Sequence, residues 1–160
     1  AFALCSGTLG ACFEGNIAGV PGLALSQEFD SAVRNAFAAE YVLDEKVHEK
    51  LHSQTARVLS TILPQFLSLK PFKSPITWSI NMPYNLADGQ VSLKRCRIGR
   101  TQYGSCYQQD NNRFVQQQLD IVSDAAKDTD TYNISCGKVT LTAIDIHALG
   151  QDVHSAEFEI

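Results

Sequence analysis

Two kinds of hydrophobic spacing alternate along this chain and together predict a mixed α/β protein. Over residues 7–18 and 44–63, apolar side chains recur every three to four positions, the spacing of a helix with one buried face. Residues 27–43 carry aromatic and apolar side chains at four-residue steps, so this ambiguous stretch has helical character. Shorter apolar runs, typical of buried strands, stand at 2–5, 20–26, 76–82, 91–98 and 138–144.

Capping and helix-breaking residues set the expected limits of the two long helices. Gly19 and Pro21 should end the first helix. Asp44 has the side chain of an N-cap at the start of the second helix, and Pro64 and Pro71 should end that helical region.

The order of these elements predicts how the sheet is built. A helix between two strands favours a parallel pair near the N-terminus, whereas later strands joined by short turns add antiparallel pairing. Residues 103–121 are rich in Gln and Asn and predict an excursion, either a hairpin or a mobile loop. The chain reads as one domain over residues 1–160, with an α/β part at about 1–70 and a β-rich part at about 71–160. A sheet that starts in the middle of a fold has an unpaired edge, so we expect a missing piece or a partner beside it.

Composition and charge narrow the class of protein. The formal net charge of −4 over 160 residues argues against a partner that is a nucleic-acid polymer. No apolar run approaches the length of a membrane span, so no membrane partner is expected. The chain has five cysteines, an odd number, and no two of them have C-x-x-C spacing. This favours a reducing, cytoplasmic setting without disulfides. Cys106, in a polar stretch, should be an exposed thiol, but no adjacent base would make it a nucleophile.

The tripeptide Ser6-Gly7-Thr8 lies between an apolar run and the first predicted helix. The first turn of a helix has unpaired backbone N–H groups and a partial positive charge, so anions bind there. Gly7 allows a ligand to approach the backbone, and Ser6 and Thr8 add hydroxyl donors. The sequence therefore predicts a phosphate site at these three residues. The plainer interpretation is that Ser6 only caps the helix.

A metalloprotease-like motif lies on the second long helix. His48 and His52 belong to an H-E-x-x-H sequence, and positions four apart share a helix face. A catalytic zinc needs a third protein ligand, but Thr55 and Val58 stand where the extended motif has Gly and His. Leu51 lies on the predicted core face of the helix. We therefore predict a solvated helix face at the two histidines, without zinc.

Other charged residues offer weaker signals. Arg95 and Arg97 belong to a small basic cluster and would share one face of a strand, where they either attract a phosphorylated substrate or are simply solvated. Asp130 is a candidate for a minor ordering role near a site, with loop capping as the alternative. Asp145 and His147 alternate on a predicted strand, but no third member of a catalytic group is evident.

Four blocks of sequence, taken in order, resemble the SurE (survival protein E) family of metal-dependent 5′/3′-nucleotidases. The first is the most specific, and is similar to the pattern SGT-x-x-A-x-E-G…G-x-P-x-x-A-x-S; the last is similar to T-D-x-x-A-V-x-x-G-x-V-S-I-T-P-L. The blocks are Ser6-Gly7-Thr8-Leu9-Gly10-Ala11-Cys12-Phe13-Glu14-Gly15 with residues 19–26, residues 78–83, residues 94–100, and residues 129–132 with 137–144.

This resemblance implies a SurE-like fold: a partly parallel sheet with helices on its faces plus an antiparallel β excursion, with the N-terminal half of the fold absent from this sequence. It implies hydrolysis of nucleoside monophosphates with Mg²⁺ or Mn²⁺ as cofactor, and a homo-oligomer (dimer or tetramer) formed through exchanged C-terminal segments. In that family an Asp-Asp pair contributes to the metal site, and this chain has no such pair.

The resemblance leaves two functions open. Ser6, Gly7 and Thr8 would hold the phosphate of an enzyme whose metal ligands lie outside this sequence, and the chain alone would be inactive. The alternative is a non-catalytic SurE-like module for binding or assembly that lacks the metal site. Within this sequence we predict no metal ligands and name no catalytic residue.

Overall fold

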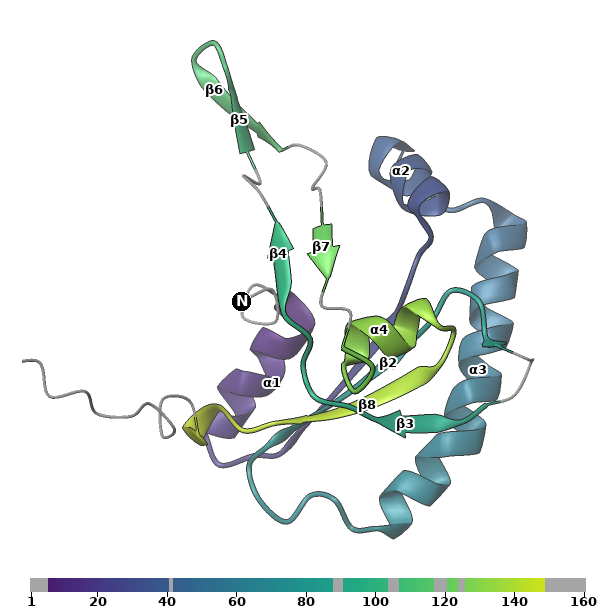
Figure 1. Ribbon diagram of the computed structural model, residues 1–160, viewed down its shortest axis with the longest axis vertical. Helices are drawn as coiled ribbons and strands as arrows, with labels where there is room; N and C mark the ends of the chain where they lie inside the picture. Colours follow the sequence, from purple (N-terminus) through teal and green to yellow (C-terminus); the bar gives the residue numbers. More distant parts are fainter. Residues whose placement is uncertain are drawn as a thin grey trace, which may run out of the picture.

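The computed structural model describes residues 6–40, 42–87, 91–103, 107–116, 121–123 and 126–148 (Figure 1). The predicted strand at 2–5 and the thiol of Cys106 lie outside the described residues. The helices are α1 (Gly7–Ile17), α2 (Ser31–Glu40), α3 (Glu45–Ser68) and α4 (Asp130–Ser135), followed by the short 3₁₀ helix η3 (Ile146–Ala148). The strands are β1 (Gly22–Gln27), β2 (Thr77–Met82), β3 (Leu93–Arg95), β4 (Thr101–Tyr103), β5 (Tyr107–Asp110), β6 (Arg113–Gln116), β7 (Ile121–Ser123) and β8 (Val139–Ile144).

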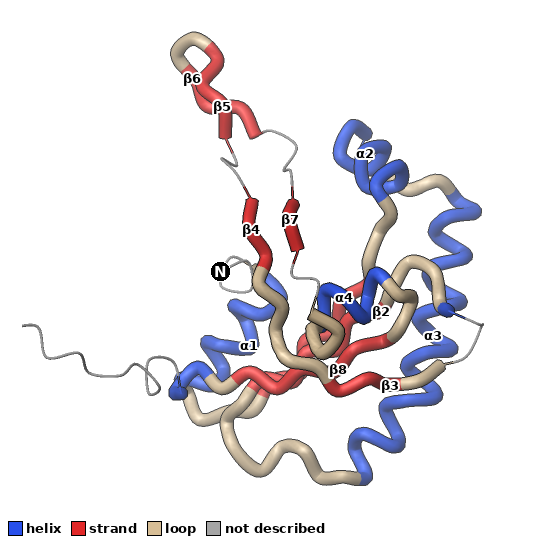
Figure 2. Tube along the Cα trace, in the orientation of Figure 1, coloured by secondary structure: helices blue, strands red, loops and turns tan. Residues whose placement is uncertain are grey.

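A four-stranded mixed sheet with the order β1-β2-β8-β3 forms the centre of the molecule (Figure 2). β1 pairs with β2 in parallel, and the connection between them runs through α2 and α3. β8 is antiparallel to β2 and parallel to β3. The α/β class with a partly parallel sheet and helices on its faces is therefore confirmed. The parallel pair expected across the first helix would include the run at 2–5 and therefore lies outside the described residues; the pair of β1 with β2 is a different one, joined by a long helical crossover.

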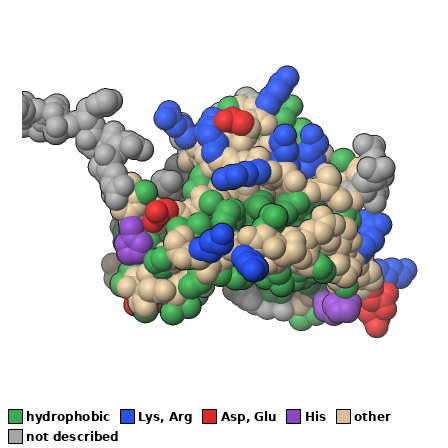
Figure 3. Space-filling view, turned by 90° about the horizontal axis from the view of Figure 1, so that it is seen from below, with side chains coloured by type: hydrophobic (Ala, Val, Ile, Leu, Met, Phe, Trp, Pro, Cys, Tyr) green, Lys and Arg blue, Asp and Glu red, His purple; other side chains and the backbone are tan. Residues whose placement is uncertain are grey.

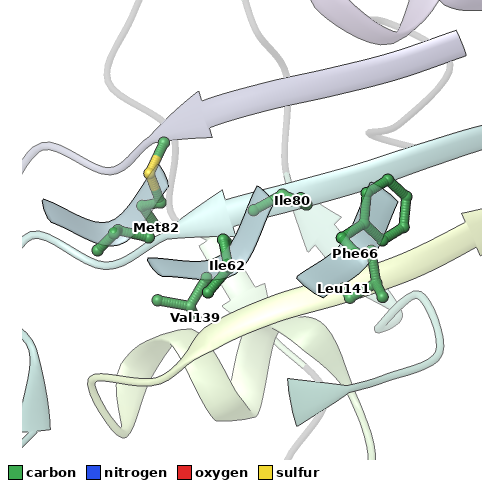
Figure 4. Packing of buried hydrophobic residues seen from close by; sticks show 7 residues of the cluster. Ile62, Phe66, Ile80, Met82, Val139 and Leu141 are labelled. Atoms are coloured by element: carbon green, nitrogen blue, oxygen red, sulfur yellow. The ribbon is translucent and has the colours of Figure 1, made fainter. Parts of the chain in front are cut away.

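The helix α3 covers one face of this sheet and makes the hydrophobic core with it (Figure 4). Its residues Val58, Ile62 and Phe66 are buried against side chains of β2 and β8. The Phe66 ring also meets the ring of Trp78 edge-on, with 5.6 Å between centroids. Burying side chains of this size contributes about 1.5–3 kcal/mol each, so this face provides most of the driving force for folding. The sheet residues of the cluster are Ile80, Met82, Val139 and Leu141.

The start of α3 follows the prediction, but its end does not. Asp44 caps the helix by accepting hydrogen bonds from the backbone N–H groups of Lys46 and Val47. Pro64 was expected to end the helix, yet α3 continues to Ser68. Pro64 lies on the exposed side of the helix, where water can bond the carbonyl that proline leaves without its partner. Continuation places Phe66 in the core, and this burial outweighs the lost hydrogen bond.

The helices α1 and α4 lie on the opposite face of the sheet, and α1 is anchored there by a polar contact. Thr77 donates a hydrogen bond of 2.6 Å to the side-chain oxygen of Asn16, and both residues are buried. At Gly22 an added Cβ would lie 2.6 Å from Cys12 Cβ, so the helix approaches the strand where the strand has no side chain. The predicted helix at 7–18 and the strand ending near residue 26 are confirmed by α1 and β1.

The stretch at 103–121 contains a β excursion, which confirms the hairpin alternative. β5 and β6 form an antiparallel pair, and β4 pairs with β7 nearer the body of the molecule (Figure 1). Within 27–43, the expected helical character appears as α2, whose first turn is capped by Asp30. The strand expected at 91–98 is shorter and is confined to β3. Among the described helices, none combines the length and apolarity needed to cross a bilayer.

Candidate functional site

A hollow of about 290 Å³, here called the cleft pocket, lies on the sheet face that carries α1 and α4. Its walls come from the beginning of α1, the beginning of α4 and the segment 98–101, and its floor comes from β1, β2 and β8. An adjoining hollow of about 260 Å³ shares Ser26, Asn81, Asp130 and Thr131 with it. Because β1 and β2 end at this region, it is the kind of place where ligands bind in α/β proteins.

Ser6 lies at the edge of the cleft pocket and caps α1. Its hydroxyl oxygen accepts a hydrogen bond of 3.3 Å from the backbone N–H of Leu9, so the expected capping role is present. The hydroxyl hydrogen stays available to donate to a ligand. Gly7 and Thr8 are exposed and lie next to the pocket without forming its lining. Among the described residues, apart from its chain neighbours and the backbone of its own helix, no atom lies within 4 Å of the position that a Cβ on Gly7 would take. The described part of the chain thus leaves the first turn of α1 open to an approaching group.

Asp130 joins the segment 98–101 to the first turn of α4. Its Oδ1 atom accepts hydrogen bonds from the backbone N–H of Gly99 at 2.7 Å and of Thr131 at 2.8 Å. The Asp130 backbone N–H in turn donates to the carbonyl of Arg97. A Cβ on Gly99 would overlap the hydroxyl of Thr131, so this segment meets α4 at a distance that only glycine permits. Asp130 is thus held firmly in the wall of both hollows.

The floor of the cleft pocket is made of small polar side chains that composition and spacing did not single out. Ser79 of β2 is paired with Thr142 of β8, and Asn81 is paired with Thr140. The hydroxyl oxygens of Thr140 and Thr142 are buried and have no hydrogen-bond partner among the described residues. The signal in the sequence was the alternation of Thr with Val and Leu along the strand at 138–144, which predicts one apolar and one polar face.

The electrostatic character of the cleft pocket differs from that of the helix end beside it. Within the described part of the chain, Asp130 is the only charged residue in the lining of the cleft pocket, and the adjoining hollow adds Glu28. An anion would therefore be repelled inside these hollows, whereas the exposed first turn of α1 carries partial positive charge. The arrangement separates an anion-binding helix end from a neutral to acidic pocket.

The two arginines proposed from the sequence lie outside the lining of both hollows. Arg95 is exposed and is paired with Leu141, on the sheet face that packs against α3. Arg97 forms an ion pair of 2.7 Å with Asp128, and this hydrogen bond lowers the pKa of the Asp128 carboxyl group. Both cations therefore affect a ligand in the cleft only through their longer-range charge.

The remaining candidates from the sequence have structural surroundings of their own. His48 and His52 are exposed on α3, with 6.3 Å between ring centroids, and no group of three metal-ligating side chains occurs among the described residues. Asp145 accepts a hydrogen bond from the backbone N–H of His147, as a turn residue does. The pKa of the Cys96 thiol is raised, mainly by burial. Because the thiolate is the reactive form, this cysteine is a poor candidate for a nucleophile.

Comparison with known proteins gives one consistent family. The family model described as survival protein SurE matches residues 1–105. A 5′-nucleotidase SurE of Clostridium botulinum (strain 657 / Type Ba4) is 25% identical over 147 residues, covering 88% of this chain and 51% of that protein. A 5′-nucleotidase SurE of Neisseria meningitidis serogroup C is 29% identical over 148 residues, covering 89% of this chain and 52% of that protein.

One solved structure was also matched. The SurE protein from Aquifex aeolicus matches with a TM-score of 0.48 and 16% sequence identity, over 92% of this chain and 56% of that chain. The chain thus spans about half the length of the curated relatives it matches.

Proposed function

The chain belongs to the survival protein SurE family, and we propose that it is part of a phosphatase that hydrolyses nucleoside monophosphates. The proposed contribution of this part is the phosphate-binding end of α1, formed by Ser6, Gly7 and Thr8. The relatives are named 5′-nucleotidases, which supports this substrate class. The observation that carries the proposal is the open first turn of α1 at the edge of the cleft pocket.

The chemistry assigned to this helix end is electrostatic. In hydrolysis of a phosphate monoester, the oxygen of water bonds to phosphorus, the ester P–O bond breaks, and the products are the nucleoside and inorganic phosphate. Negative charge on the non-bridging oxygens is stabilised by donors that already point at them. In our proposal the backbone N–H groups of Gly7 and Thr8 and the Ser6 hydroxyl are these donors, because α1 holds them in place before substrate arrives.

A divalent cation, Mg²⁺ or Mn²⁺, is proposed as the cofactor of the whole enzyme from the family relationship. The residues described here do not suit such a site, because hard cations take several oxygen ligands and Asp130 stands in the cleft pocket as a single carboxylate. We therefore propose that the ligands come from outside this sequence. The 160-residue chain alone is expected to release no phosphate from a nucleoside monophosphate with either cation.

The second candidate is a non-catalytic SurE-like module for binding or assembly. It is favoured by the lack of a metal-ligating group among the described residues. The intact mass of the natural protein separates the two candidates. A mass near 17.5 kDa supports the module, and a mass far above it supports the enzyme.

We also propose that the complete protein is a cytoplasmic homo-oligomer. Large hydrophobic side chains are exposed on its surface, where another subunit could cover them. Leu69 is 74% exposed near the end of α3, and Phe114 is 74% exposed on β6. Figure 3 shows one face of the molecule, seen from below, on which hydrophobic side chains lie among Lys and Arg. Cys12, Cys96 and Cys136 are free thiols, which suits a reducing compartment.

Substitution of Gly7 by Val in the complete natural protein tests the phosphate site. The added side chain enters open space, so folding should be preserved, but it blocks close approach of a phosphate to the backbone. We expect kcat/KM for a nucleoside monophosphate to fall at least tenfold, which corresponds to about 1.4 kcal/mol. Ser6→Ala should have a smaller effect, since it removes one hydroxyl and a cap worth about 1 kcal/mol.

The matched control is Gly10→Val, in the next turn of the same helix and also with no atom within 4 Å of the added Cβ. It should leave kcat/KM unchanged. Unchanged kinetics in the Gly7→Val enzyme, or an equal loss in both variants, would contradict the phosphate site.

A further inference from the structure

The lining of the cleft pocket points to an occupant that is polar and uncharged. Beside Asp130, the polar side chains of its floor and walls are hydroxyls and one amide, including Ser79, Asn81 and Thr142. Among the described residues, no Lys or Arg belongs to this lining. A phosphate seated inside would face the Asp130 carboxylate without a compensating cation, which is unfavourable at short range. The phosphate therefore belongs at the end of α1, and a neutral group belongs in the pocket.

Asp130 has the hydrogen-bonding capacity for a pair of hydroxyl groups. Its Oδ1 atom is occupied by the backbone N–H groups of Gly99 and Thr131. Its Oδ2 atom accepts no hydrogen bond from the described residues, so two lone pairs remain on a carboxylate whose orientation is already fixed. The two neighbouring hydroxyl groups of a sugar can both donate hydrogen bonds to one carboxylate, so a carboxylate held in this way suits them.

Thr142 gives a second and independent indication. It is 2% exposed and forms part of the pocket wall, yet its hydroxyl has no partner among the described residues. A buried hydroxyl without a partner is unfavourable, because it has lost its hydrogen bonds to water. Rotation about its χ1 bond moves the hydroxyl to another staggered position, so a hydroxyl group inside the pocket can become that partner.

We infer that the cleft pocket receives the sugar of a nucleoside 5′-monophosphate and that Asp130 accepts hydrogen bonds from its 2′- and 3′-hydroxyl groups. This inference rests on the proposed function, because it places the sugar next to a phosphate bound at Ser6, Gly7 and Thr8. Ser6 and Asp130 line the same hollow, so one continuous space connects the helix end to the carboxylate. Asp130 thereby becomes a residue that selects ribonucleotides over 2′-deoxyribonucleotides.

The test measures binding of three probes to the complete natural protein by ligand-observed NMR or calorimetry: adenosine, 2′-deoxyadenosine and inorganic phosphate. The variant is Asp130→Asn, whose side-chain oxygen can still accept from Gly99 and Thr131 while the second oxygen becomes an amide. The matched control is Asp128→Asn, a nearby exposed carboxylate outside the lining of both hollows. Circular dichroism checks that both variants fold.

We expect Asp130→Asn to weaken adenosine binding about tenfold, the effect of losing a hydrogen bond to a charged group. Wild type should prefer adenosine to 2′-deoxyadenosine, the variant should not, and Asp128→Asn should behave as wild type. The affinity for inorganic phosphate should be unchanged or higher in Asp130→Asn, because a negative charge is removed.

Two results would overturn the sugar site while leaving the proposed function intact. In the first, Gly7→Val abolishes phosphate binding, but adenosine and 2′-deoxyadenosine bind with equal affinity and Asp130→Asn changes neither affinity. The other is line broadening by Mn²⁺ that Asp130→Asn removes, which would make the pocket a cation site. By contrast, adenosine binding that depends on Asp130, without phosphate binding or hydrolysis, would refute the phosphatase and retain the sugar site.

Discussion

The two faces of the central sheet differ sharply in chemistry although they are made by the same strands. Along β2, Ile80 and Met82 pack into the core beneath α3, whereas Ser79 and Asn81 alternate with them and line the cleft pocket on the other face. The apolar face is closed by Val58, Ile62 and Phe66 of one long helix. The polar face is covered by two separate helices, α1 and α4, with a hollow between them.

This difference indicates that the face under α3 stabilises the fold, whereas the opposite face carries the candidate binding site. The face under α3 buries large apolar side chains with their rings and methyl groups in contact. The other face buries the hydroxyls of Thr140 and Thr142, which find no partner in the described part of the chain, and such burial is unfavourable for folding. Locally unfavourable features of this kind cluster where a protein binds ligands, because selection for function maintains them.

Removal of the Phe66 ring should produce the largest change, because it breaks the apolar face. Phe66 is 2% exposed and contacts both Trp78 and Phe72. We expect Phe66→Ala to lower the free energy of unfolding by about 3–5 kcal/mol, measured by urea denaturation. Val42→Ala, at a position that is 66% exposed, is the control and should change it by no more than about 0.5 kcal/mol. Similar values for the two variants would show that α3 does not form the core.

Replacing threonine by valine on the polar face should have a smaller effect of opposite sign. Thr140→Val and Thr142→Val each remove a buried hydroxyl without a partner and keep the shape of the side chain. We expect each to raise the free energy of unfolding by about 1 kcal/mol in the same denaturation experiment.

The two threonine variants also separate stability from binding. Thr142 lines the cleft pocket and Thr140 does not, so only Thr142→Val should weaken adenosine binding. A loss of stability in both variants would mean that partners not described here satisfy these hydroxyls.

The smallest effect is expected at the Arg97–Asp128 ion pair, outside both faces. The hydrogen bond from Arg97 lowers the pKa of Asp128 below its ordinary value. A carboxyl group with a lower pKa in the folded state contributes stability above its unfolded pKa and loses it as pH falls through the folded pKa. Asp128 is 67% exposed, so this contribution should be slight.

Arg97→Ala should therefore raise the pKa of Asp128 towards its ordinary value, as followed by NMR titration of the carboxyl carbon. Its unfolding profile between neutral pH and pH 3 should differ little from that of wild type. An unchanged Asp128 pKa would show that the ion pair does not form in solution.

Elements whose causes are local could be predicted from the amino-acid sequence. The three-to-four-residue spacing located α1 and α3, and the side chains of Ser6 and Asp44 identified their caps. The runs at 76–82 and 138–144 located β2 and β8, and the Ser6-Gly7-Thr8 block led to the family. These features depend on residues close together in the chain, and periodicity and capping report such interactions directly.

Features that depend on residues far apart in the chain could be seen only in the folded protein. The continuation of α3 past Pro64 follows from burial of Phe66 against a strand that comes later in the chain. The hydrogen bond from Gly99 to Asp130, and the meeting of Ser79 with Thr142, require the register of β2 on β8 and the docking of α4. No local pattern encodes which strand becomes the neighbour of another, because pairing is settled by the packing of the whole sheet. The polar floor of the cleft pocket is therefore a property of the assembled fold.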